Sequence, residues 1–170
     1  AGINFSLHYQ LLKGRTLVFW KDPECRFFLL MCLVLTLVVG FNVYRTVYPD
    51  VGQTLRLAAF QVVSIVTTTG FATADYEMWP AMSQIIIFLC MFVGASAGST
   101  GGGMKCLRIM LCFKYCYREL FSMIHPRAVA HIKIGGKVVP DGVVRSVLGF
   151  VVLYMILFVL CTVLLAGIGV

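Results

Sequence analysis

Charged residues are scarce in this 170-residue chain: they make up 12% of it, whereas hydrophobic residues make up 60%. A soluble domain has about 25% charged residues. The chain therefore lacks the polar residues needed to cover a surface in water. This scarcity argues against a soluble protein, and we expect an all-α integral membrane protein surrounded by lipid.

Three further patterns are missing. No signal-peptide pattern opens the chain, which begins with Ala1, so we interpret it as an internal part of a longer polypeptide. Cys112 and Cys116 share a helix face, but no His or carboxylate joins them at the spacing of zinc ligands. No pair of acidic residues faces the middle of an apolar run, so we expect no enzyme.

Basic residues flank the apolar runs, and the formal net charge is +7. Residues 1–26 and 105–145 carry twelve Lys and Arg residues, whereas residues 45–80 carry only Arg45 and Arg56. Basic loops stay on the cytoplasmic side of a membrane, so both flanks are predicted to be cytoplasmic. This distribution explains the positive charge better than nucleic-acid binding does, and we expect no nucleic-acid partner.

The uncharged stretches predict the spans. Residues 27–44 are long enough to cross a bilayer as a helix, and a last span is expected over 143–170. A shorter apolar run predicts a helix of about 53–66 that dips into the membrane without crossing it.

The next span is predicted to be broken. Residues 82–93 favour a helix, but Gly94–Gly103 contains five glycines in ten residues and cannot form a stable helix interior. A second helix is expected over 104–123. The order of span, half-dip and broken span is that of a membrane–pore-loop–membrane unit, abbreviated M1–pore loop–M2, with a broken M2 helix.

Thr67–Phe71 follows the short helix and has the composition of an ion filter. Backbone carbonyls can replace the water shell of an ion, and glycine permits dihedrals that let neighbouring carbonyls point the same way. The helix aims its negative C-terminal end at this segment, which favours a cation. The alternative for this segment is a β-branched turn with a glycine cap.

Two motifs together resemble a known family. TTTGFATADY at 67–76 and GASAGSTGGGMKCLR at 94–108, with the basic segment GRTLVFWKDPE at 14–24, resemble the TrkH/KtrB/HKT superfamily of potassium transporters, and the bacterial TrkH family within it most of all. The resemblance implies potassium uptake across the bacterial inner membrane by a multi-pass protein. It also implies four such repeats around one pore with pseudo-fourfold symmetry.

The resemblance divides the chain into four parts. The expected parts are the cytoplasmic end of the preceding repeat with a linker at 1–26, the third repeat at 27–123, a cytoplasmic linker at 124–142, and the first helix of the next repeat at 143–170.

The resemblance also assigns roles to individual residues. The expected selectivity filter is Thr67, Thr68, Thr69, Gly70 and Phe71, with the transported K⁺ held at Thr68, Thr69 and Gly70 and with Phe71 packed behind the filter glycine. The expected gating loop below the filter is Gly94, Ala95, Ser96, Ala97, Gly98, Ser99, Thr100, Gly101, Gly102 and Gly103. The basic positions that follow it are Lys105 and Arg108, and any carboxylate or carbonyl partner of Lys105 is expected to lie outside this chain.

The partners implied are the remaining repeats, a second copy in a homodimer, and a cytosolic nucleotide-binding ring protein similar to TrkA. The cytoplasmic segment 105–137, with Arg118, Arg127, His131 and Lys133, is the expected docking surface, although its charge also fits ordinary cytoplasmic loops. No organic cofactor is expected.

Other interpretations remain open. A subunit of a tetrameric cation channel would share the pore loop but carry a TVGYG filter, and a Na⁺/K⁺ transporter of the same superfamily would share both motifs. A phosphate-binding enzyme is disfavoured, because Lys105 follows Met and no Ser or Thr comes next.

The charge distribution predicts that residues 72–80 face the outside of the cell. A cysteine replacing Asp75, in a protein whose native cysteines have been removed, should react with a membrane-impermeant thiol reagent added to intact cells. Reaction only after permeabilisation would reverse the predicted topology.

Overall fold

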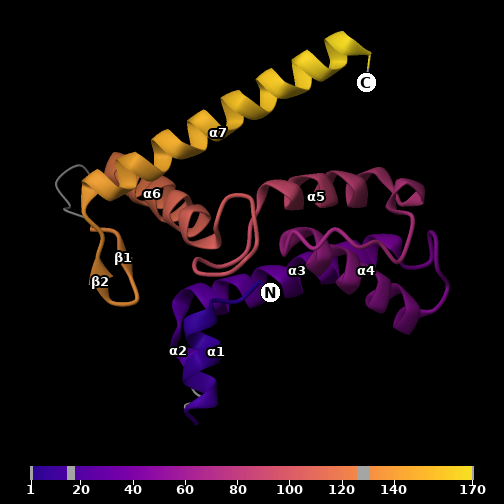
Figure 1. Ribbon diagram of the computed structural model, residues 1–170, viewed down its shortest axis with the longest axis horizontal. Coiled ribbons are helices and arrows are strands. Elements are labelled where there is room, and N and C mark those ends of the chain that lie inside the picture. Colours follow the sequence, from indigo (N-terminus) through magenta and orange to yellow (C-terminus); the bar gives the residue numbers. More distant parts are fainter. Residues whose placement is uncertain (1, 15–17, 126–130, 170) are drawn as a thin grey trace. The chain divides into compact units, whose positions relative to one another are not determined.

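The computed structural model describes residues 2–14, 18–125 and 131–169, and these are mostly helical (Figure 1). The chain forms two units, residues 1–109 and 110–170. The first unit holds α1 (Phe5–Leu12), α2 (Val18–Lys21), α3 (Pro23–Val43), α4 (Val51–Val66), the 3₁₀ turn η1 (Tyr76–Met78) and α5 (Ala81–Phe92). Helix α6 (Cys106–Ile124) begins in the first unit and continues into the second, which also holds the strands β1 (Lys133–Ile134) and β2 (Lys137–Val138) and the helix α7 (Asp141–Ile168).

Helix α3 begins at a capping residue, Asp22, that is followed by a proline. The carboxylate of Asp22 accepts a hydrogen bond from the Cys25 amide at 2.7 Å, and Pro23 occupies the first turn, where its missing amide costs nothing. The helix has 21 residues and thus spans about 31 Å, close to the thickness of a bilayer core. Within the described residues, α3 and α7 are the two helices long and apolar enough to cross a membrane.

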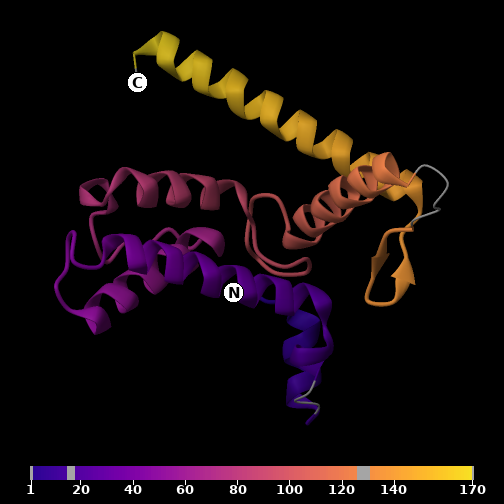
Figure 2. The same cartoon turned by 180° about the vertical axis from the view of Figure 1, so that it is seen from behind.

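Helix α4 is too short to cross, as the sequence predicted. It has 16 residues and starts at a cap in which Asp50 accepts from the Gln53 amide at 2.7 Å. Its buried positions Ala58, Val62 and Val66 recur every four residues, so they form one face. Figures 1 and 2 show the chain after α4 running back along that helix to the start of α5.

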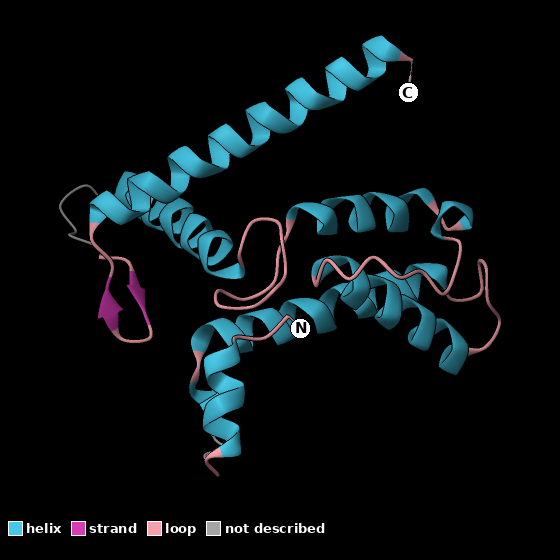
Figure 3. Ribbon diagram, viewed as in Figure 1, coloured by secondary structure: helices cyan, strands magenta, loops and turns pink. Residues whose placement is uncertain are grey.

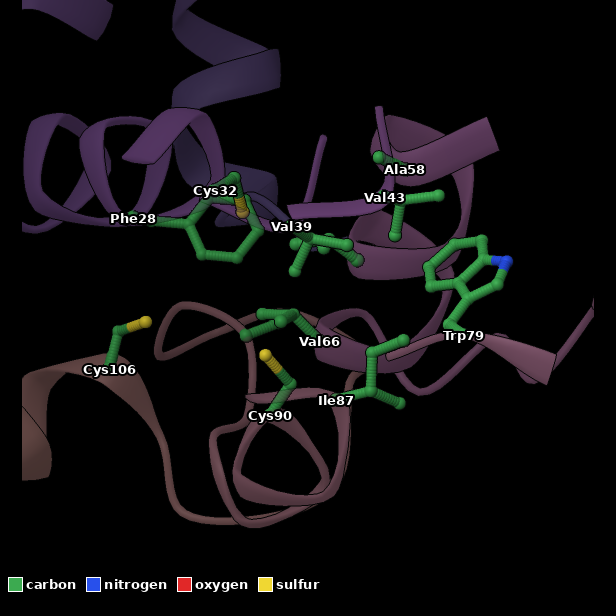
Figure 4. Close-up of a cluster of buried hydrophobic side chains, with 12 residues drawn as sticks. Phe28, Cys32, Val39, Val43, Ala58, Val66, Trp79, Ile87, Cys90 and Cys106 are labelled. Atoms are coloured by element: carbon green, nitrogen blue, oxygen red, sulfur yellow. The ribbon is translucent and has the colours of Figure 1, made fainter. Parts of the chain in front are cut away.

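The core of the first unit lies where α3, α4 and α5 pack against one another. Figure 4 shows Val66 of α4 between Val39 of α3 and the Ile87 and Cys90 side chains of α5. A polar contact fixes the same packing, because the Ser83 hydroxyl of α5 hydrogen-bonds the Asn42 side-chain oxygen of α3 at 2.7 Å. The outer positions of α3 are exposed and apolar, such as Leu30 and Leu33, which suits a helix that faces lipid or neighbouring protein.

The predicted break between two helices is confirmed. Helix α5 ends at Phe92 and α6 starts at Cys106, and the glycine-rich run lies between them without helical structure (Figure 3). The other predicted helices also form, with ends that differ by a few residues from the predicted ones.

The second unit contains a hairpin that the sequence analysis did not predict. Strands β1 and β2 pair antiparallel through a turn at Gly135 and Gly136, whose φ angles are +55° and +81° (Figure 3). Two consecutive positive φ angles are typical of a tight hairpin turn. Ile132, Leu111 and Val144 form a small core beneath it. Arg127, part of the predicted docking surface, lies outside the described residues.

Candidate functional site

The candidate filter begins as a hydrogen-bonded cap on the C-terminal end of α4. The Thr68 amide donates to the Ile65 carbonyl at 2.9 Å, and the Thr69 amide donates to the Ser64 carbonyl at 2.8 Å. This pair of bonds, with a left-handed residue at Thr68, is the Schellman motif that commonly ends helices. The segment is thus anchored to α4 through its backbone.

All four amides from Thr67 to Gly70 point back into α4. The Thr67 amide bonds the Val63 carbonyl at 2.9 Å, and the Gly70 amide bonds the Ser64 carbonyl at 3.3 Å. The carbonyl oxygens of Thr67–Gly70, in contrast, accept no hydrogen bond from any described residue. The segment therefore offers a row of oxygens that are available to a ligand.

The backbone of this row is not uniformly extended. Thr68 and Gly70 have φ angles of +55° and +81°, in the left-handed region. A β-branched residue there is an outlier and costs on the order of 1–3 kcal/mol, so the surrounding contacts must hold it. The left-handed cap residue is Thr68, whereas the alternative interpretation of this segment, a β-branched turn, had a glycine as its cap.

The side chains around the candidate filter are tied to the same helix end. The Thr67 hydroxyl donates to the Val63 carbonyl at 2.7 Å and lies 2.7 Å from the Thr69 hydroxyl. The Ser64 hydroxyl donates to the Phe71 carbonyl at 2.6 Å, which fixes the exit of the segment. The Phe71 ring is 71% exposed within this chain, and its packing behind Gly70 stays a prediction.

The glycine-rich loop closes on itself at a narrow neck. The Gly94 amide donates to the Met104 carbonyl at 2.7 Å, and the Met104 amide donates to the Phe92 carbonyl at 3.1 Å. A Cβ atom placed on Gly94 would lie 2.0 Å from the Gly102 carbonyl oxygen. Only glycine permits the two arms of the loop to approach this closely.

The structure brings the loop and the candidate filter together. The Gly102 amide donates to the Thr68 hydroxyl at 2.9 Å, across 34 positions of sequence. A Cβ on Gly101 would lie 3.4 Å from the Thr67 carbonyl oxygen and 2.6 Å from the Ala95 side chain. The arm of the loop at 101–102 thus lies directly against the start of the filter segment.

Lys105 binds the loop itself, which corrects the prediction that its partner lies outside the chain. Its ammonium group donates to the Ser99 carbonyl at 3.3 Å and also to the Gly101 carbonyl. The Lys105 ammonium group thereby satisfies two backbone carbonyls that the broken helix leaves without a partner. Arg108 lies one turn further on, in the first turn of α6, and is half-buried.

The opposite side of the loop contacts two segments that precede it in sequence. The Ser96 amide donates to the Gly2 carbonyl at 3.0 Å, and the Phe5 amide donates to the Gly98 carbonyl at 3.1 Å. The Ala97 amide donates to the Glu24 carboxylate at 2.6 Å. The N-terminal segment therefore contacts the loop directly.

Comparisons with known proteins agree on one family. The family model described as TrkH, cation transport protein, matches residues 1–169. This chain belongs to the TrkH family. It is 40% identical over its whole length to the Trk system potassium uptake protein TrkH of Salmonella typhimurium and 42% identical to that of Halomonas elongata.

A solved structure supports the same assignment for this TrkH-family chain. The crystal structure of the potassium transporter TrkH from Vibrio parahaemolyticus superposes with a TM-score of 0.88 at 39% identity, over 94% of this chain and 35% of that one. The chain spans 36% of the length of its Salmonella and Halomonas relatives. It is part of a multi-pass protein of the bacterial inner membrane.

The sequence analysis of this TrkH-family chain missed Glu24 and the N-terminal segment. Glu24 is 9% exposed in the first turn of α3, where a carboxylate is common because it suits the helix dipole. That ordinary position gave no sign of a contact 73 residues away. The hairpin did carry a signal, since Gly135-Gly136 between two short alternating runs is a typical turn sequence. No cluster of three or more His, Cys, Asp or Glu side chains that could hold a metal occurs in the described part of the chain.

Proposed function

We propose that this chain supplies one of the four pore loops of a potassium-uptake protein, with Thr67–Gly70 as its share of the selectivity filter. The observation that carries the proposal is the division of the backbone there: the amides are occupied by α4 and the carbonyl oxygens are not. An ion entering a filter loses its water shell and needs oxygen ligands in its place. K⁺ is then held at Thr68, Thr69 and Gly70.

The electrostatics of α4 support a cation at this position. The carbonyl ends of a helix carry a partial negative charge, and the candidate filter starts at the last turn of α4. No charged side chain lies between Arg56 and Asp75. The segment itself therefore offers a cation backbone dipoles and no charged side chain that would trap it in an ion pair.

The glycine-rich loop is proposed as the gate of this pore. Its contact with Thr68 puts it next to the candidate filter, and the neck at Gly94 and Met104 leaves 95–103 as a unit that can move. A gate needs two conformations that differ by a few kcal/mol, and a glycine-rich backbone can supply them. The Ser96 hydroxyl is buried without a hydrogen-bond partner, so this conformation does not satisfy every polar group of the loop.

The partners of the complete protein are also proposals. The relatives are named as members of a Trk system, which indicates more than one component. We propose a homodimer and a cytosolic nucleotide-binding ring similar to TrkA. In the second unit, Arg118, His131 and Lys133 lie near the hairpin, with Lys114 beside them, and we propose them as the described part of the docking surface. The four-part division into 1–26, 27–123, 124–142 and 143–170 follows from the same repeat architecture.

Replacing Gly70 by Ser tests the filter. The substitution meets no atom within 4 Å, so its effect arises from the positive φ of +81°, which costs a side-chain residue about 1–2 kcal/mol. The carbonyls should rotate, and the preference for K⁺ over Na⁺ should fall at least several-fold while expression is retained. The measurement is K⁺ uptake, in a medium with high Na⁺, by a strain that lacks its own K⁺ uptake systems.

Gly136→Ser is the matched control. Gly136 has the same φ of +81° and the same open surroundings, but it lies in the hairpin turn. It should leave ion preference unchanged. Equal effects of the two substitutions, or no effect of Gly70→Ser, would remove Gly70 from the filter.

Deleting Ser96–Thr100 tests the gate. If the loop obstructs the pore, the shortened protein should conduct more K⁺ and respond less to regulation, because the obstruction is gone. Flux into proteoliposomes, normalised to the amount of protein, measures this. If the loop serves only to pack helices, flux and expression should fall together, and that result would retire the gate.

A further inference from the structure

Glu24 is a buried carboxylate that the proposed filter and gate do not use. It lies in the first turn of α3 and is 9% exposed, and its Oε1 accepts from the Ala97 amide at 2.6 Å. A carboxylate removed from water is costly unless it is hydrogen-bonded. Its partner lies at the middle of the glycine-rich loop, so the interaction joins a membrane-spanning helix to the loop.

The same carboxylate also reaches the far end of the loop. The Leu107 amide, in the first turn of α6, and the Lys105 ammonium lie near enough to stabilise its charged form. The amides at the start of a helix carry a partial positive charge, which favours an anion there. Glu24 therefore binds the centre of the loop and lies close to the start of α6, the helix that follows the loop.

The hydrogen bond between the Ala97 amide and Glu24 is stronger than the bonds that the loop forms with Thr68 and Gly2. The Thr68 hydroxyl is an uncharged acceptor for Gly102, and Gly2 contributes an uncharged backbone carbonyl for Ser96. A hydrogen bond to an ionised group is about twice as strong as one between neutral groups. The Lys105 ammonium binds carbonyls of the loop from the neck, so it does not join the loop to α3.

We infer that Glu24 is a positioning residue that latches the loop in place against Thr68. The inference rests on the proposed function of the loop as a gate. Release of the Ala97 amide from Glu24 removes the contact between the centre of the loop and α3. The centre is then restrained by the neutral bonds of Ser96 and Gly98 to the N-terminal segment, while the neck at Gly94 and Met104 stays closed. The closed position of the gate is then set by a carboxylate on α3, far from the loop in sequence.

Ser96 provides a reporter of the loop position. It is 1% exposed, and its hydroxyl has no partner, so Ser96→Cys loses no hydrogen bond and puts a protected thiol in the loop. The background is the full-length protein with Cys112, Cys116 and Cys161 replaced by alanine. The four remaining cysteines of this chain are buried, and the same background without Ser96→Cys gives the rate of reaction of these and of any cysteine elsewhere in the protein.

The experiment combines Ser96→Cys with Glu24→Gln and measures labelling by a methanethiosulfonate reagent on purified protein. Glutamine keeps the size and an acceptor oxygen but loses the charge. The labelling rate should rise about tenfold, since it follows the population of the released loop. Glu77→Gln, at an exposed carboxylate outside the loop's contacts, should leave the rate unchanged.

Glu24→Asp protects the test against misfolding. Aspartate keeps the charge but is one methylene shorter, so the labelling rate should rise less than in Glu24→Gln. If Glu24→Gln does not give monodisperse protein, the labelling rate of Glu24→Asp alone tests the latch. Labelling at the unsubstituted rate in a folded Glu24 variant would overturn the latch. Faster labelling with unchanged K⁺ flux would support the latch and instead overturn the gate.

Discussion

A backbone amide or carbonyl away from water must find its hydrogen-bond partner inside the protein. This constraint matters most in the candidate filter, Thr67–Gly70, and in the glycine-rich loop, Gly94–Gly103, because neither segment is helical. At the end of α4 the amides of Thr67–Gly70 return to the helix, which leaves their carbonyls for something else to bind. At the break between α5 and α6 the freed groups are divided among Lys105, Glu24 and the N-terminal segment. The need to satisfy these groups shapes both segments.

The two segments also depend on each other. The Thr68 side chain is held in a left-handed conformation that a β-branched residue seldom adopts, and its hydroxyl accepts from Gly102. The loop in turn lies against the filter only because Gly94 and Gly101 leave no side chain in the way. Movement of the loop would therefore remove a contact from the candidate filter, so the proposed gate and the candidate filter are physically linked.

The sequence predicted the elements that depend on local signals. Apolar length defined α3 and α7, and glycine density defined the break after Phe92. It could not predict contacts between distant residues, because Glu24 and Ala97 look ordinary where each stands. The left-handed Thr68 was equally hidden, since propensity argues against Thr there and only the tertiary contacts hold it. The role of Phe71 was taken from the resemblance, and this chain leaves its ring exposed.

The central claim is that α4 binds the amides of Thr67–Gly70, whereas the carbonyl oxygens of the same residues are free to bind an ion. Rubidium is an anomalous scatterer that replaces potassium, so diffraction from crystals of the full-length protein grown in rubidium chloride tests the claim most directly. We predict anomalous density beside the carbonyl oxygens of Thr68, Thr69 and Gly70. Density confined to other parts of the protein, or carbonyls of this segment hydrogen-bonded to neighbouring repeats, would contradict the account.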